Sequence, residues 1–385
     1  PLNHASKVCA NVGSSLRSKR RLTSYKLTAN SGASTAYSNA STLSASAGAV
    51  TVSAISTSGS GVSQSGLVTA KSAAITGTTN SSSGTAVTLG AVTLVAGGGN
   101  LVVTGNNANQ TGTGITQTGA ITDNVVGGNI TFRSNNNINQ TGAVTMVSNP
   151  GTTAAVLTYD VSTGNSTSSI VAGSLTITGT NTGPIDYNLF AAGAQLIPGA
   201  ISVPGTITLD NTYGGTSGVG GAPTSGYITA SNLSLATTNI GIVVDSALSA
   251  NRGVVIRGAS YGGTNTMGIR TWANITSSQG NIDLTGFTQS GQAMSNLNPN
   301  VAWQPATISA PLGSINATGT VAGTDGYGVD FYGNMPLSAK SISVLGTGSL
   351  ASGVATRLGS LTILAGGSDL LVVGNNSNQA GTGIS

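Results

Sequence analysis

The chain of 385 residues carries few charges: charged residues make up only 6% of it, there is no glutamate, and glycine fills 57 positions. Because 38% of the residues are hydrophobic, the composition excludes a typical disordered chain, and the shortage of helix-forming side chains argues against amphipathic helices. Six of the 13 basic residues lie in the first 26 positions, so the rest, with 7 basic and 9 acidic residues, lacks the basic stripe needed to bind nucleic acid.

Residues 1–28 are expected to form a basic, disordered arm outside the main fold. They contain the basic run 17–21, the only cysteine (Cys9) and the only histidine (His4). A lone cysteine excludes an intrachain disulfide, and no apolar run is long enough to predict a transmembrane helix. Since the sequence begins with Pro1 and stops partway through a repeat, we expect it to be a fragment of a longer protein.

The rest of the chain repeats one short pattern. Residues 89–116 return as residues 358–385, at an offset of 358 − 89 = 269, with 17 of 28 positions identical. In each copy a glycine and a small residue precede alternating apolar residues, and an asparagine-rich corner follows. Alternation with period 2 predicts β-strands, and a repeated strand-turn-strand unit predicts a solenoid.

The spacing of the repeats predicts the architecture. The Gly99-Asn100 pair recurs at an offset of 128 − 99 = 29, Ile282 is followed by Ile315 at 315 − 282 = 33, and Ile342 follows at 342 − 315 = 27. We therefore predict that residues 29–385 form one all-β body, a right-handed parallel β-helix (β-solenoid) with coils of about 20–33 residues. Valine, leucine and isoleucine should point inward and stack from coil to coil, while threonine, serine and asparagine point outward.

Three stretches interrupt the pattern and are expected to be loops inserted into the coils. They are rich in proline, glycine or aromatic residues, and solenoids often place binding surfaces on such insertions. The predicted insertions lie near residues 181–200, 210–227 and 288–311.

The coil units resemble those of filamentous haemagglutinin-like adhesins of Gram-negative bacteria, which are exported by two-partner secretion, and of the related autotransporter passengers. The resemblance covers about residues 40–385, and its best units are residues 142–146, 280–286 and 359–365, with Gly268-Ile269 and Asn274-Ile275 before the second of these. The secretion domain of that family is not found in this sequence.

The resemblance implies a structural and adhesive rod of a large adhesin, secreted or held at the bacterial cell surface. Its implied partners are host-cell or environmental glycans and matrix proteins, together with an outer-membrane transporter during export. Self-association of such rods is a further expectation. We expect no enzymatic activity and no cofactor.

The alternative is a carbohydrate-active β-helix enzyme, a lyase or a hydrolase. Such enzymes use clustered carboxylates, often with Ca²⁺, or a basic residue as the catalytic base. The candidates are separate in sequence, and we interpret them as surface charges with occasional ion pairs; we predict no catalytic or metal-binding residue. These candidates are Asp283, Asp325, Asp330, Arg252, Arg257 and Arg270, of which Arg270 and Asp330 lie two coils apart, at an offset of 330 − 270 = 60.

Two further surface features have alternative interpretations. Thr-x-Thr pairs such as Thr176-Ile177-Thr178 are typical of ice-binding faces, but unequal coil lengths are expected to disrupt the register that such a face needs.

Aromatic residues could stack on sugars or pack at the coil corners. The predicted surface-contact residues are Tyr261, Trp272, Trp303, Tyr327 and Tyr332, with Phe331 beside the last.

Overall fold

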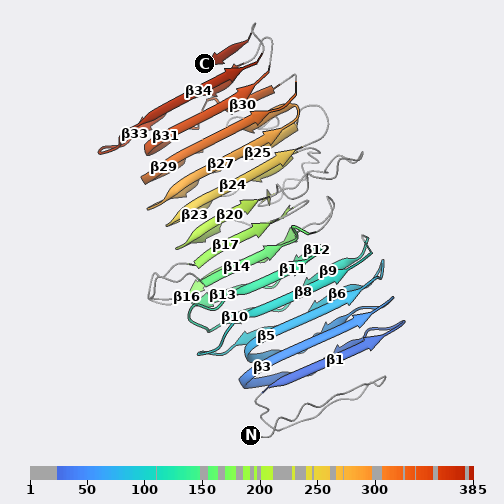
Figure 1. Ribbon diagram of the computed structural model, residues 1–385. Helices are drawn as coiled ribbons and strands as arrows, with labels where there is room; N and C mark the ends of the chain where they lie inside the picture. Colours follow the sequence, from blue (N-terminus) through green and yellow to red (C-terminus); the bar gives the residue numbers. More distant parts are fainter. Residues whose placement is uncertain are drawn as a thin grey trace. The chain divides into compact units, whose positions relative to one another are not determined.

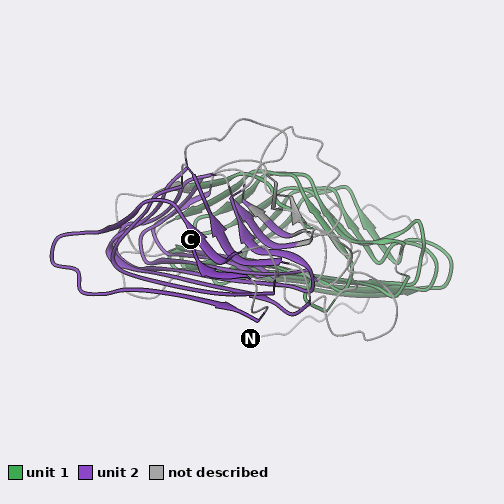
Figure 2. Cartoon of the chain, turned by 90° about the horizontal axis from the view of Figure 1, so that it is seen from above, with its two compact units in different colours: residues 1–185 green, residues 186–385 purple. Residues whose placement is uncertain are grey.

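A computed structural model places the chain in two compact units, residues 1–185 and residues 186–385, coloured separately in Figure 2. The described residues contain strands and no helix. They are residues 24–109, 111–147, 155–163, 170–178, 185–190, 195–196, 201–210, 228–229, 240–244, 247–260, 266–271, 273–296, 306–323, 326–333, 335–349, 354–377 and 381–385.

In the first unit, equivalent strands of neighbouring coils pair in parallel to form two sheets (Figure 1). The long sheet contains β1 (Tyr25–Ser31), β3 (Leu43–Ser56), β5 (Val68–Thr79), β7 (Val92–Leu94), β8 (Leu101–Asn107), β10 (Ile121–Asp123), β11 (Ile130–Ser134), β13 (Val144–Val147), β14 (Ala155–Asp160) and β16 (Leu175–Thr178). The short sheet contains β2 (Tyr37–Asn39), β4 (Val62–Gln64), β6 (Thr85–Leu89), β9 (Thr113–Gln117), β12 (Asn137–Gln140) and β15 (Ile170–Val171).

The second unit repeats this arrangement with its own strands, also parallel. Its long sheet contains β17 (Ile185–Phe190), β19 (Ile201–Val203), β20 (Thr206–Asp210), β23 (Leu248–Ala250), β24 (Gly253–Ser260), β26 (Ile275–Ser277), β27 (Asn281–Thr288), β29 (Ile308–Val321), β31 (Leu337–Gly348), β33 (Leu361–Ile363) and β34 (Leu370–Asn376). Its second sheet, which we call the outer sheet, contains β22 (Ile240–Val244), β25 (Thr266–Thr271), β28 (Gly291–Ser295), β30 (Gly326–Phe331), β32 (Val354–Leu358) and β35 (Thr382–Ile384). Separately, β18 (Gln195–Leu196) pairs with β21 (Ile228–Thr229).

The predicted all-β parallel solenoid is confirmed, and so are two of the predicted repeat offsets. Ile282 pairs with Ile315 and Ile315 with Ile342, so the two predicted sequence offsets are each one coil. One coil is longer than predicted, because Ile207 pairs with Val254, at an offset of 254 − 207 = 47. This coil contains the predicted insertion 210–227, of which residues 211–227 lie outside the described residues.

The predicted boundaries need three corrections. The first described strand, β1, starts at Tyr25, within the arm predicted for residues 1–28, and residues 1–23 lie outside the described residues. β17 and β18 lie within the loop predicted for residues 181–200. β28 and the start of β29 lie within the loop predicted for 288–311, where residues 297–305 are outside the described residues. In β17 and β28 the strand pattern outweighs the nearby prolines and glycines that suggested loops.

Inward side chains stack in columns because the register places equivalent residues over one another. In the first unit one such column contains buried Val50, Ala73, Leu101, Ile130 and Leu157. Neighbouring parallel strands lie about 4.8 Å apart, so each aliphatic side chain packs on its counterparts in the adjacent coils. A single coil buries too little apolar surface to be stable, and the stacking supplies the rest.

One inward column contains a carboxylate. Asp123 pairs with Leu94 on one side and Met146 on the other, and both of those side chains are fully buried. Asp123 itself is 1% exposed; its Oδ1 accepts the Val125 N–H at 2.8 Å, and its Oδ2 has no hydrogen-bond partner among the described residues. Burial raises the pKa of Asp123 from 3.8 to about 6.

The asparagine-rich corners bond mainly to backbone. The Asn107 amide donates to the carbonyls of Ser81 and Gly84 in the preceding coil, at 3.0 and 3.1 Å. Direct amide–amide bonds also occur: Gln140 Nε2 donates to Gln117 Oε1, and Asn39 Nδ2 donates to Gln64 Oε1, each at 2.8 Å. The coil corners are thus tied together by side chains that satisfy buried carbonyl groups.

A column of glycines lets the two sheets of the second unit approach closely. Gly258, Gly286, Gly319 and Gly346 lie in register on neighbouring coils. A Cβ atom at Gly319 would overlap the Gly328 carbonyl oxygen, so any larger residue would force the backbone to move. Glycine is needed at these positions because it has no Cβ atom that would collide with the facing strand.

The threonine columns correct one prediction. Thr69, Thr93, Thr122, Thr145 and Thr176 pair in register although the coils between them differ in length. Unequal coil lengths therefore do not disrupt the register, because the loops absorb the difference. The Thr-x-Thr pair itself does not repeat, since Thr178 pairs with Val147.

Candidate functional site

The outer sheet of the second unit aligns charged and polar residues on consecutive coils. Arg270 pairs with Ser295, Ser295 with Asp330, and Asp330 with Arg357. The predicted two-coil separation of Arg270 and Asp330 is therefore confirmed. The fourth member, Arg357, was missed by the sequence analysis, although its offset from Asp330, 357 − 330 = 27, equals one coil.

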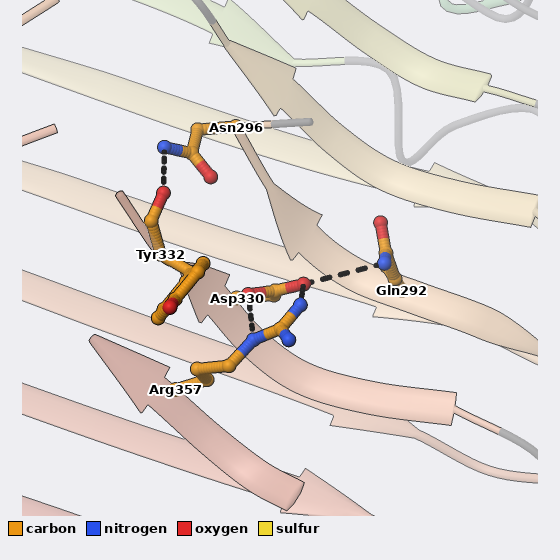
Figure 3. Close-up of polar contacts among 5 residues, drawn as sticks. All are labelled: Gln292, Asn296, Asp330, Tyr332 and Arg357. Carbon is orange, nitrogen blue, oxygen red and sulfur yellow. Dashed lines mark hydrogen bonds and ion pairs between the residues drawn. The ribbon is translucent and has the colours of Figure 1, made fainter. Parts of the chain in front are cut away.

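Asp330 and Arg357 form a two-point ion pair (Figure 3). Arg357 Nε lies 2.7 Å from Asp330 Oδ1, and Nη2 lies 2.5 Å from Oδ2. The Asp330 side chain is fully buried, whereas that of Arg357 is 26% exposed. Hydrogen bonding to Asp330 raises the pKa of Arg357 above its ordinary value. Parallel charge-assisted bonds of this kind fix the orientation of the guanidinium group.

Two of the predicted surface-contact residues lie on this guanidinium group. The Cζ atom of Arg357 is 5.0 Å from the ring centroid of Tyr327 and 4.8 Å from that of Tyr332. Tyr332 is 50% exposed and Tyr327 is half-buried, so neither packs in the core, whereas Phe331 is fully buried. We call Tyr327, Arg357 and Tyr332 the Tyr-Arg-Tyr cluster. Cation–π contacts of this length stabilise the orientation of the rings.

Two amide side chains border the cluster. Gln292 Nε2 lies 3.4 Å from Asp330 Oδ2, and Asn296 Nδ2 donates to the Tyr332 carbonyl at 2.8 Å. Figure 3 shows the Gln292 amide nitrogen turned toward Asp330 and its oxygen turned away. Gln292 Oε1 and Asn296 Oδ1 are buried and have no hydrogen-bond partner among the described residues. Buried acceptors without donors are uncommon and call for an explanation.

The other three predicted contact residues, Tyr261, Trp272 and Trp303, lie outside the described residues. The two described ones, Tyr327 and Tyr332, lie together on Arg357.

Two of the candidate catalytic residues, Asp283 and Arg257, bond to neighbouring side chains. Asp283 accepts a hydrogen bond from Asn316 Nδ2 at 2.7 Å, and Arg257 lies 3.4 Å from Asp210 on the neighbouring coil. Asp325 lies outside the described residues, and Arg252 is exposed. In the part of the chain that the structure describes, no three His, Cys, Asp or Glu residues gather closely enough to hold a metal ion.

Comparison with known proteins gives no match to any family model, curated protein or solved structure. Among the described residues there is also no helix suited to crossing a membrane.

Proposed function

We propose that this chain is a structural and adhesive segment of a bacterial protein that is secreted or displayed on the cell surface. The observation that carries the proposal is the Tyr-Arg-Tyr cluster, where an exposed aromatic ring is held in place on the outer sheet. Partly exposed aromatic residues with polar neighbours are typical of recognition surfaces.

The solenoid fold supports the same role. Each coil is hydrogen-bonded to its neighbours along the sheets, so a surface carried by one coil keeps a fixed position relative to the next. The proposed partners are glycans or matrix proteins on host cells or in the environment. The proposed export route passes through an outer-membrane transporter, as in the adhesins that the coil units resemble.

Binding of the purified full chain to arrays of glycans and extracellular-matrix proteins tests this proposal. We expect saturable binding to at least one class, weakened by the double substitution Tyr327→Ala/Tyr332→Ala and unchanged by Tyr25→Ala in the first unit. No binding to any glycan, matrix protein or cultured cell would contradict an adhesive role. Release of soluble sugar products from the same glycans would favour the enzyme alternative instead.

A further inference from the structure

We infer that the side-chain amide of Asn109, in the corner between β8 and β9, is a site of N-glycosylation. Residues 109–111 read Asn-Gln-Thr, which fits the acceptor pattern Asn-x-Ser/Thr. The same three residues return at 139–141, and the pattern recurs elsewhere in the chain. Hydrogen bonding in the structure distinguishes Asn109 from the other candidates. The modification goes beyond the proposed adhesive role and does not depend on it.

The Asn109 amide is bonded through its oxygen alone. Oδ1 accepts the Thr111 backbone N–H at 3.1 Å and the Thr111 hydroxyl at 2.8 Å. Because a backbone N–H only donates, the accepting end of the amide must be the oxygen. Nδ2 has no hydrogen-bond partner among the described residues and is not one of their buried polar atoms, so it can meet another molecule. Asn109 is half-buried and Thr111 is exposed.

Neighbouring groups hold the corner at Asn109 in its bent conformation. The Asn109 N–H donates to Asn107 Oδ1 at 3.0 Å. The Asn109 carbonyl accepts Asn136 Nδ2 from the next coil at 2.9 Å and the Gly112 N–H at 3.1 Å. The turn that places the Thr111 hydroxyl on the amide is therefore formed before any enzyme binds, and little conformational entropy is lost on binding.

The identical residues 139–141 are held in an extended conformation instead. Asn139 lies on β12, which pairs with β9 and β15 on the two adjacent coils. Side chains two residues apart along a strand are separated by about 6.6 Å, and no hydrogen bond joins the side chains of Asn139 and Thr141. An enzyme that needs the bent tripeptide would have to break the pairing of β12.

Other Asn-x-Ser/Thr tripeptides use the amide nitrogen within the fold. Asn39 Nδ2 donates to Gln64 Oε1 at 2.8 Å, and Asn316 Nδ2 donates to Asp283 Oδ1 at 2.7 Å. Within the described residues, Asn109 is the one asparagine of such a tripeptide whose amide oxygen accepts the hydroxyl of the third residue.

The group transferred is a hexose from a nucleoside diphosphate sugar. As the bond between Asn109 Nδ2 and the anomeric carbon forms, the bond from that carbon to the diphosphate oxygen breaks. The nucleoside diphosphate leaves with the electron pair, and one Nδ2 proton passes to a base on the transferase. By donating to Oδ1, the Thr111 hydroxyl polarises the amide and makes this proton easier to remove.

The test incubates the folded full chain with UDP-glucose and a soluble N-glycosyltransferase that modifies synthetic peptides 104–114 and 134–144 to the same extent. Peptide mapping by tandem mass spectrometry measures the hexose at each asparagine. We expect occupancy at Asn109 to exceed that at Asn139 by at least about tenfold, because reaction at Asn139 must first break hydrogen bonds of β12. Equal occupancy, a preference for Asn139, or no hexose at Asn109 would overturn the inference.

Variants test the part played by the hydroxyl. Thr111→Ser should retain the hexose at Asn109 and Thr111→Ala should abolish it, while the matched control Thr141→Ala should leave it unchanged. Asn378, at the equivalent repeat position (378 − 109 = 269), is followed by Gln379 and Ala380 and should stay unmodified. Circular dichroism and melting temperature confirm that each variant is folded. Modification that survives Thr111→Ala would contradict the assignment, and because the readout is covalent mass, that failure leaves the adhesive proposal standing.

Discussion

Replacing Asp123 with asparagine should stabilise the protein at neutral and alkaline pH. The wild-type carboxylate lies in an apolar column between Leu94 and Met146, and its Oδ2 has no partner among the described residues. Asparagine keeps the shape and the oxygen that accepts the Val125 N–H, but it removes the charge.

The magnitude follows from the pKa of Asp123, raised from 3.8 to about 6 by burial. A difference of about two pKa units corresponds to roughly 3 kcal/mol. The folded state binds the Asp123 proton more tightly than the unfolded state does, so Asp123 does not reduce the wild-type free energy of unfolding below about pH 4. As the pH rises from about 4 to about 6, the free energy of unfolding falls, and above about pH 6 the full reduction remains.

Urea unfolding of wild type and Asp123→Asn, followed by circular dichroism from pH 4 to pH 8, measures this cost. We expect the variant to be more stable than wild type by about 2–3 kcal/mol at pH 8, with the advantage shrinking steadily as the pH falls toward 4. The control Asp369→Asn, at an exposed carboxylate, should show no such trend. A stability difference that is absent at pH 8, or that does not change with pH, would refute the reasoning.

Two other changes test the packing of the second unit. Arg357→Met leaves the buried Asp330 carboxylate without its cation and should reduce the free energy of unfolding by roughly 2 kcal/mol. Adding Asp330→Asn should restore much of that loss. A double variant no more stable in urea than the single variant would contradict this. Gly319→Ala places a Cβ against a backbone carbonyl oxygen and should lower the free energy of unfolding by at least about 3 kcal/mol. The control Gly32→Ala, whose Cβ would have nothing within 4 Å, should leave it nearly unchanged. Equal urea midpoints for the two variants would show that the sheets can separate without penalty.

The sequence predicted most of the coil pattern because that pattern is local. Alternating apolar residues determine which side chains point inward, and the intervals between Ile282, Ile315 and Ile342 are those of the strand register. Loop boundaries were less accurate. Proline and glycine near β17 and β28 suggested insertions, yet the strands form because their backbones pair with neighbouring coils.

The candidate site was only half predictable. Tyr327 and Tyr332 stood out as aromatic residues in a chain with 4% aromatic content. Arg357 did not, because its importance depends on the residue beside it in the next coil, and adjacent coils are far apart in sequence. The signal that could have found it was its offset from Asp330, which equals the coil interval between Ile315 and Ile342.

By itself, the sequence determined that this protein is built of parallel β-coils, since the alternation of side chains and the repeat length are properties of short segments. Tertiary structure alone decided that threonines stay in register across unequal coils, that Asp123 is buried among Leu94 and Met146, and that Asp330 meets Arg357. The physical reason is that loops absorb differences in coil length, so side-chain neighbours are set by strand pairing between coils and not by distance along the chain.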